Sequence, residues 1–158
     1  MATTATIEEL LKQHYQRKKG YKLFYEVKRS SGYIKPERFA DAVAVSLFPS
    51  NGISLTGYEF KSSRADLLND LRDLSKSEAI KQFCDYWILI VTDEEILKGK
   101  IQIPDDWGIW YVYKDCMTKV EFFRTHRKPK QLYPKPVDRY FLVSLLSQKN
   151  HAIELIRP

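Results

Sequence analysis

Three charged residues in the first half of the chain have the types and the spacing of a site for phosphodiester hydrolysis. Asp41 stands in the otherwise apolar run FADAVAV, where an ionised carboxylate needs a counter-charge or a metal ion. Glu59 and Lys61 stand two apart in GYEFK, so on a β-strand both side chains project from one face. Two carboxylates can hold Mg²⁺, and a lysine can orient the nucleophile or stabilise charge on a phosphate.

The segments around these residues predict the strands that would bring them together. Residues 38–48 and 53–61 are rich in apolar residues, and the turn signal PSNG separates them. A hairpin of these two strands would place Asp41 within a few ångströms of Glu59. An E-x-K pair alone is more often a surface ion pair, and Asp41 could likewise stand in a structural salt bridge. The proposed chemistry therefore depends on the pairing of these two strands.

Hydrophobic periodicity and turn residues predict a mixed α/β fold. The run YWILIVT at 86–92 is typical of a strand that is buried on both faces in the middle of a sheet. The other elements expected are a helix ending near Gly20, strands over 21–27, 108–113 and 119–123, a helical region after Ser63, an extended proline-rich loop over 124–136 and a helix capped by Asp138. The order α, β, β, β, α, β with additions indicates a mixed sheet covered by helices.

Length and composition narrow the class of protein. The chain has 158 residues, enough for one domain with a real core, and no stretch that approaches 18 consecutive apolar residues. Its two cysteines are too few for a disulfide scaffold or a four-cysteine zinc site. We therefore expect no membrane partner and a cytoplasmic location.

Charge is unevenly distributed along the sequence, although the net charge is only +6. Residues 12–38 hold nine basic and two acidic side chains, residues 41–106 hold seven and twelve, and residues 114–139 hold eight and three. An acidic middle between two basic arms fits a cation-binding centre within a frame that attracts phosphate. Chance clustering of surface charges explains the same pattern about equally well.

The motifs resemble those of the PD-(D/E)XK nuclease superfamily. The stretches RFADA at 38–42, GYEFKSSRAD at 57–66 and CDYWI at 84–88 are similar to the MmcB-like DNA-repair branch, over roughly residues 20–110. The resemblance implies a restriction-endonuclease-like αβββαβ core at about residues 6–113 of a single domain 1–158, followed by a basic loop and a C-terminal helix at 114–158. It also implies a Mg²⁺-dependent deoxyribonuclease, with Mn²⁺ able to substitute, acting in DNA repair, recombination or the processing of phage or mobile-element DNA.

The resemblance implies roles for individual residues. Asp41 and Glu59 would bind the metal, and Lys61 would be the catalytic lysine. A further carboxylate often joins such sites from the first helix or the first strand. We prefer Glu26, on the first strand, to Glu9, which a capping box with the preceding Thr6 explains.

Polar and basic side chains around this core are candidates for contacts with DNA phosphates. The candidates are Arg38, Ser63, Arg64, Lys76, Arg127, Lys128 and Lys130. The alternatives are a helix cap with a solvated arginine at 63–64 and a flexible charged loop after 124. Two other functions stay open, a non-catalytic nuclease-fold module that binds DNA or protein, and a homodimeric junction resolvase.

Overall fold

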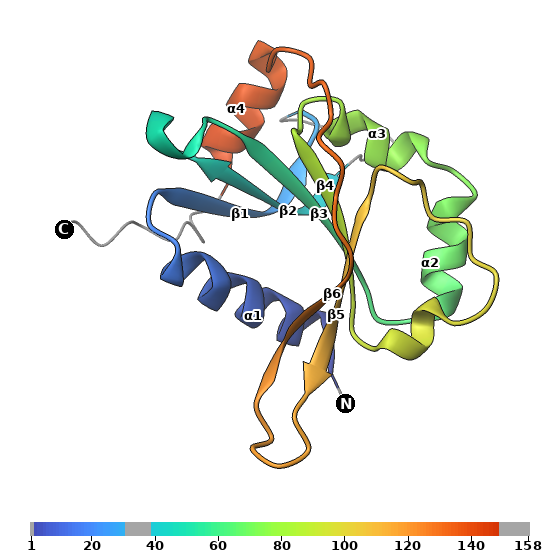
Figure 1. The fold of residues 1–158 in the computed structure, drawn as a ribbon. Helices are drawn as coiled ribbons and strands as arrows, with labels where there is room; N and C mark the ends of the chain where they lie inside the picture. The colour runs from blue at the N-terminus through green and yellow to red at the C-terminus, as the bar shows by residue number, and fades with distance from the viewer. Residues whose placement is uncertain (1, 31–38, 149–158) are drawn as a thin grey trace.

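The computed structural model describes residues 2–30 and 39–148, which form one six-stranded sheet with helices on both faces (Figure 1). Strands β1 to β3 pair antiparallel, β3, β4 and β5 pair parallel, and β6 pairs antiparallel with β5. The spatial order follows the chain: β1 (Tyr21–Lys28), β2 (Phe39–Ser46), β3 (Leu55–Lys61), β4 (Tyr86–Val91), β5 (Gly108–Lys114) and β6 (Glu121–Arg127). The prediction of a mixed α/β fold is confirmed.

The helices cover the two faces unequally. Helix α1 (Thr4–Arg17) lies on one face of the sheet (Figure 1). There Ile7 and Leu11 pack among the side chains of β1, β2 and β3. The other face carries three helices: α2 (Arg64–Leu71), α3 (Ser75–Lys81) and α4 (Arg139–Ser147). Helices α2 and α3 form the connection between the parallel strands β3 and β4, which no tight turn could make.

Strand β3 separates the two faces residue by residue. Tyr58 and Phe60 are buried under α1, whereas Glu59 and Lys61 project toward the side of α2. Gly57, earlier on the same strand, lets the ring of Trp87 pack directly against the backbone of β3. A Cβ atom at position 57 would lie only 2.3 Å from that ring. Trp87 starts the buried run of β4, and this strand lies inside the sheet as the sequence predicts.

Two local expectations were wrong. The capping box of α1 joins Thr3 and Thr6, whose side chains each accept from the other's backbone N–H, and the side chain of Glu9 instead accepts from Gln13. Residues 124–127 belong to strand β6 and not to an extended loop, because their backbone continues the ladder with β5. The sheet therefore gains basic residues on its β6 edge.

Helix α1, the three strands after it, the helices α2 and α3 and strand β4 follow the order that the sequence predicts. That this arrangement is a restriction-endonuclease-like core stays a prediction. Within residues 2–30 and 39–148, none of the helices has the length and apolar character needed to cross a membrane.

Candidate active site at the end of strand β3

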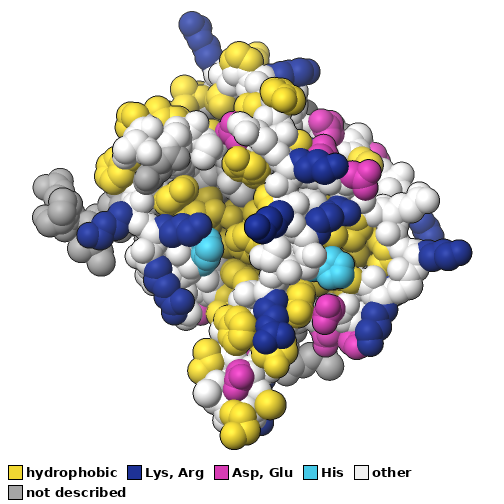
Figure 2. Space-filling view, viewed as in Figure 1, with side chains coloured by type: hydrophobic (Ala, Val, Ile, Leu, Met, Phe, Trp, Pro, Cys, Tyr) yellow, Lys and Arg dark blue, Asp and Glu magenta, His cyan; other side chains and the backbone are white. Residues whose placement is uncertain are grey.

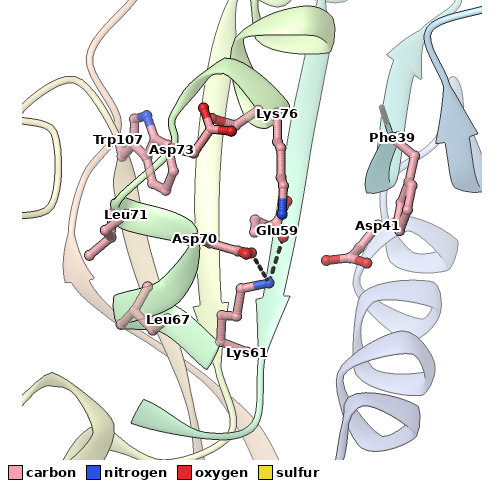
Figure 3. A pocket seen from close by; sticks show the side chains of 11 residues that line it. Phe39, Asp41, Glu59, Lys61, Leu67, Asp70, Leu71, Asp73, Lys76 and Trp107 are labelled. Carbon is pink, nitrogen blue, oxygen red and sulfur yellow. Dashed lines mark hydrogen bonds and ion pairs between the residues drawn. The ribbon is translucent and has the colours of Figure 1, made fainter. Parts of the chain in front are cut away.

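The β2–β3 hairpin brings Asp41 and Glu59 together. Ala42 pairs with Tyr58, and continuing this register by one residue sets Asp41 opposite Glu59. Both side chains line a pocket of about 230 Å³ between the sheet and helix α2 (Figure 3). The two carboxylates and Lys61, which we singled out from their types and spacing, thus share one pocket.

Lys61 is held by two carboxylates from different elements. Its Nζ lies 2.7 Å from Glu59 Oε1, on the same strand, and 2.6 Å from Asp70 Oδ2, on α2 (Figure 3). The Lys61 side chain is only 12% exposed. The ammonium group therefore has a fixed position at the floor of the pocket and is largely shielded from solvent.

Asp41 is fixed by the backbone of the neighbouring strand. Its Oδ2 accepts a hydrogen bond of 2.7 Å from the Phe60 N–H. One carboxylate oxygen of Asp41 thus has a defined partner, and Figure 3 shows the carboxylate directed into the pocket from β2.

Burial and mutual repulsion make the carboxylate pair electrostatically unfavourable. Burial raises the pKa of Asp41. Burial, followed by the charge of Asp41, raises the pKa of Glu59 to about 8. Burial alone would lower the pKa of Lys61, but Glu59 and Asp70 outweigh it and hold that pKa above its ordinary value. A perturbed carboxylate pair beside a lysine in a pocket is typical of a functional site.

Carboxylate oxygens are the donor type that a hard divalent cation prefers, and the pocket offers them from Asp41 and Glu59. Within residues 2–30 and 39–148, no group of three or more His, Cys, Asp or Glu side chains is arranged around a single metal position. Mg²⁺ commonly uses only one or two carboxylates and completes its shell with waters and substrate phosphate. The formal charge of the pocket lining is −2, from four carboxylates against two ammonium groups: Asp41, Glu59, Asp70 and Asp73, with Lys61 and Lys76.

Glu26 does not reach this pocket. The pairs Tyr25–Ala42 and Val27–Ala40 put Glu26 beside Asp41 in the register, but the pairing is interrupted at this position. Glu26 has a φ of 49°, in the left-handed region, and its side chain is exposed. Glu9 is exposed on α1, which packs on the opposite face of the sheet from the pocket.

Three of the residues predicted to contact DNA have bonds within the protein. The Ser63 hydroxyl caps α2 by accepting from the Asp66 N–H at 3.2 Å. The Arg64 guanidinium donates to the carbonyls of Ile96 and Lys98. Arg127 donates from Nε to the carbonyl of Trp107 at 2.9 Å and from Nη2 to that of Pro104. Ser63 thus caps a helix and the two arginines hold neighbouring loops, and phosphate contact stays a prediction for all three.

Of the predicted lysines, Lys76 lies at the pocket and the other two are exposed elsewhere on the surface. Lys76, at the start of α3, lines the pocket and extends toward Glu59 in Figure 3. Lys128 and Lys130 are exposed on the segment that follows β6. Figure 2 shows Lys and Arg side chains spread over one face of the molecule, with acidic side chains mainly toward one side. Arg38 lies outside the described residues.

The sequence reasoning missed Asp70 and Asp73, which line the pocket from the segment after β3. A signal was present, because Asp66, Asp70 and Asp73 stand at positions i, i+4 and i+7, the spacing of one helical face. The spacing alone does not show whether this acidic face of the helix is directed toward the side chains of β3 or toward solvent.

Comparison with known proteins supports the fold alone. No protein-family model matches the chain, and no curated protein is similar to it at a significant level. Among solved structures, it resembles the SPO1766 protein of unknown function from Silicibacter pomeroyi, with a TM-score of 0.53 and 18% sequence identity. The similarity covers 90% of this chain and 77% of that protein. At this identity, the arrangement of helices and strands is shared and the chemistry of the pocket must be judged on its own residues.

Proposed function

We propose that this chain is a divalent-metal-dependent deoxyribonuclease of the PD-(D/E)XK type. The observation that carries the proposal is the convergence of Asp41, Glu59 and Lys61 in one pocket, where Lys61 Nζ lies 2.7 Å from Glu59. Two carboxylates opposed across a hairpin, with a lysine two residues after the second, are the side chains that metal-assisted phosphodiester hydrolysis needs.

Each of these residues has a definable task. Asp41 and Glu59 would hold Mg²⁺, or Mn²⁺ in its place, which supplies charge stabilisation at the phosphate and a more acidic bound water. Asp41 is oriented by its bond from the Phe60 N–H, so one of its oxygens keeps a constant direction. Lys61 offers an ammonium at the pocket floor that can bind a phosphoryl oxygen or orient the attacking water.

DNA is the polyanion that fits the distribution of charge. Lys76 lines the pocket, where it could meet a phosphate next to the cut, and Lys128 and Lys130 are exposed on the segment after β6 and could add contacts to the DNA backbone. A protein acting on chromosomal, phage or mobile-element DNA would work in the cytoplasm of a cell without a nucleus. Repair or recombination is the process that we propose.

The decisive experiment measures cleavage of labelled linear and branched DNA by purified protein with Mg²⁺, with Mn²⁺ and with EDTA. We expect metal-dependent cleavage that Asp41→Asn and Lys61→Ala each reduce at least about 1,000-fold, while circular dichroism shows a retained fold. Lys98→Ala is the matched control, because this lysine is 69% exposed and pairs with Glu95 away from the pocket. Equal cleavage by the pocket variants, or DNA binding without any cleavage, would contradict the proposal, and the second result would favour a non-catalytic DNA-binding module.

A homodimeric junction resolvase is a second form of the same activity. The observation that favours it is the apolar outer surface of α4, where Tyr140, Val143 and Leu146 are exposed. Sedimentation analysis together with a four-way junction substrate tests this form, which requires a dimer and symmetric cuts.

A further inference from the structure

Lys61 has two anionic partners that differ in where they are anchored. Glu59 lies two residues before it on β3, so both side chains leave the same strand. Asp70 lies on α2, and its Oδ2 is 2.6 Å from Lys61 Nζ, slightly closer than Glu59 Oε1 at 2.7 Å. The ammonium group therefore bridges the sheet and the helix.

Helix α2 gives Asp70 a position that does not depend on Glu59. The helix begins at a side-chain cap from Ser63, and Leu67 on it is buried in the core cluster of that face. The side chain of Asp70 is 32% exposed and that of Lys61 only 12% exposed, so Asp70 lies on the solvent side of the ion pair. A capped helix anchored in the core by Leu67 thus holds this carboxylate against the lysine.

The two partners would have different fates in the proposed reaction. Glu59 would turn its oxygens toward a divalent cation, and Lys61 would then lose one of its two ion pairs. A lysine has a flexible four-carbon stem, and keeping it in one rotamer costs entropy unless a partner holds it. Asp70 is the partner that remains.

We propose that Asp70 is a positioning residue, which keeps the Lys61 ammonium at the pocket floor when Glu59 is engaged by a cation. This inference rests on the proposed nuclease function. In this role Asp70 acts through its ion pair with Lys61 and not as a ligand of the cation or the phosphate.

Asp73 provides a comparison within the same pocket. It carries the same charge, but its Oδ1 accepts from the Ser75 hydroxyl at 2.5 Å and from the Ser75 N–H at 3.1 Å, at the start of α3. Neutralising Asp73 removes a negative charge from the pocket and leaves the Lys61–Asp70 ion pair in place. An effect of Asp70 that exceeds the effect of Asp73 therefore reports the ion pair and not the general electrostatics of the pocket.

The test combines kinetics with crystal structures of full-length wild type, Asp70→Asn, Asp70→Glu and Asp73→Asn, each with and without Mn²⁺. For Asp70→Asn we expect kcat to fall about 10- to 100-fold with KM for DNA unchanged within about twofold, because a misplaced group costs turnover and not binding. Asp70→Glu restores part of kcat, and Asp73→Asn loses no more than about threefold. Melting temperature controls for folding.

The structures provide a readout that does not need cleavage. With Mn²⁺ bound, we expect the Lys61 side chain to be ordered against Asp70 in wild type and to be displaced or disordered in Asp70→Asn. Wild-type placement of Lys61 and wild-type kcat in Asp70→Asn would overturn the inference and leave the nuclease proposal standing. If wild type cleaves no DNA but Lys61 still loses its position in Asp70→Asn, the positioning role is supported and the nuclease proposal fails.

Discussion

The two faces of the sheet differ in the polarity of what they enclose. On the face under α1, the sheet packs apolar and aromatic side chains against Ile7 and Leu11, and the hydroxyls of Tyr15 and Tyr58 bond to each other. On the face toward α2, the same strands bury Asp41 and Glu59 side by side. Both faces bury apolar side chains, but only the face toward α2 also accommodates a charged pocket within its packing.

Strand β3 carries both tasks with consecutive residues. Tyr58 is 1% exposed and Phe60 5% exposed, whereas Glu59 and Lys61, between and after them, form the ion pair of the pocket. Alternation of side chains along a strand lets one short segment be core and site at once. Between residues 58 and 61 of β3, core side chains and pocket side chains therefore alternate. Mutations on the two faces can test whether stability and proposed activity separate in the same way.

The largest expected effect belongs to Glu59→Gln. Cleavage of DNA should fall at least about 1,000-fold, because the variant loses a proposed metal ligand. The metal-free protein should become more stable, by about 1 kcal/mol or more, because a buried carboxylate with a raised pKa is destabilising when ionised. Urea unfolding at pH 8 in EDTA, beside the cleavage assay, measures both. A loss of stability together with a loss of cleavage would break the separation of the two faces.

On the α1 face, Leu11→Ala should lower stability and leave cleavage nearly unchanged. Leu11 is fully buried, so the variant loses about 2–5 kcal/mol of unfolding free energy through lost burial and the cavity left behind. Cleavage per folded molecule should stay within about twofold of wild type below the melting transition. Activity normalised to the folded fraction, read from circular dichroism, checks this, and a specific loss of turnover would show that α1 also shapes the pocket.

The pH dependence of stability should differ in sign between the faces. Glu59 has a pKa of about 8 against an ordinary 4.5, so the folded state binds more protons between these values and stability falls as pH rises through this range. His14, on α1, has its pKa lowered to about 4 from 6.5 by burial and by Lys18 and Arg17. There the unfolded state binds more protons, and stability falls as pH drops from 6.5 to 4.

Two variants separate these contributions when the unfolding free energy of the metal-free protein is measured at a series of pH values between 4 and 8. Glu59→Gln should flatten the decline between pH 6.5 and 8, where His14 no longer titrates. His14→Gln should flatten the decline on the acid side, because the ring Nε2 of His14 is buried without a hydrogen-bond partner among residues 2–30 and 39–148 and tolerates charge poorly. If the unfolding free energy of Glu59→Gln still fell between pH 6.5 and 8 as steeply as that of wild type, the pocket carboxylates would not be the cause of the decline.

Much of this arrangement could be predicted from sequence because it depends on local rules. The PSNG turn between two apolar runs fixes a hairpin, and side-chain alternation then dictates that Asp41 and Glu59 meet on one face. The continuous apolar run at 86–92 likewise indicates an interior strand, and β4 lies there.

The rest depends on tertiary geometry. Asp70 joins the pocket because α2 packs with Leu67 inward, and the angle of a helix to its sheet is not encoded in periodicity. Arg127 was expected to contact DNA, but it donates to loop carbonyls that lie 20 to 24 positions earlier in the sequence and that only the tertiary fold brings close. Glu26 was placed on a regular strand, and nothing in its neighbours indicates a left-handed residue.

The smallest expected effect concerns Glu26, where sequence and structure differ most. Its side chain is exposed and outside the pocket, so Glu26→Gln should leave cleavage within about twofold of wild type. Glu26→Gly should raise the unfolding free energy by up to about 1 kcal/mol, because glycine adopts a φ of 49° without the steric cost that a Cβ incurs. Cleavage rates and urea midpoints measure the two effects. If Glu26→Gln instead abolishes cleavage, β1 must change conformation in the complex with DNA, bringing Glu26 beside Asp41 as the third carboxylate. The separation of faces would then hold only for the metal-free protein.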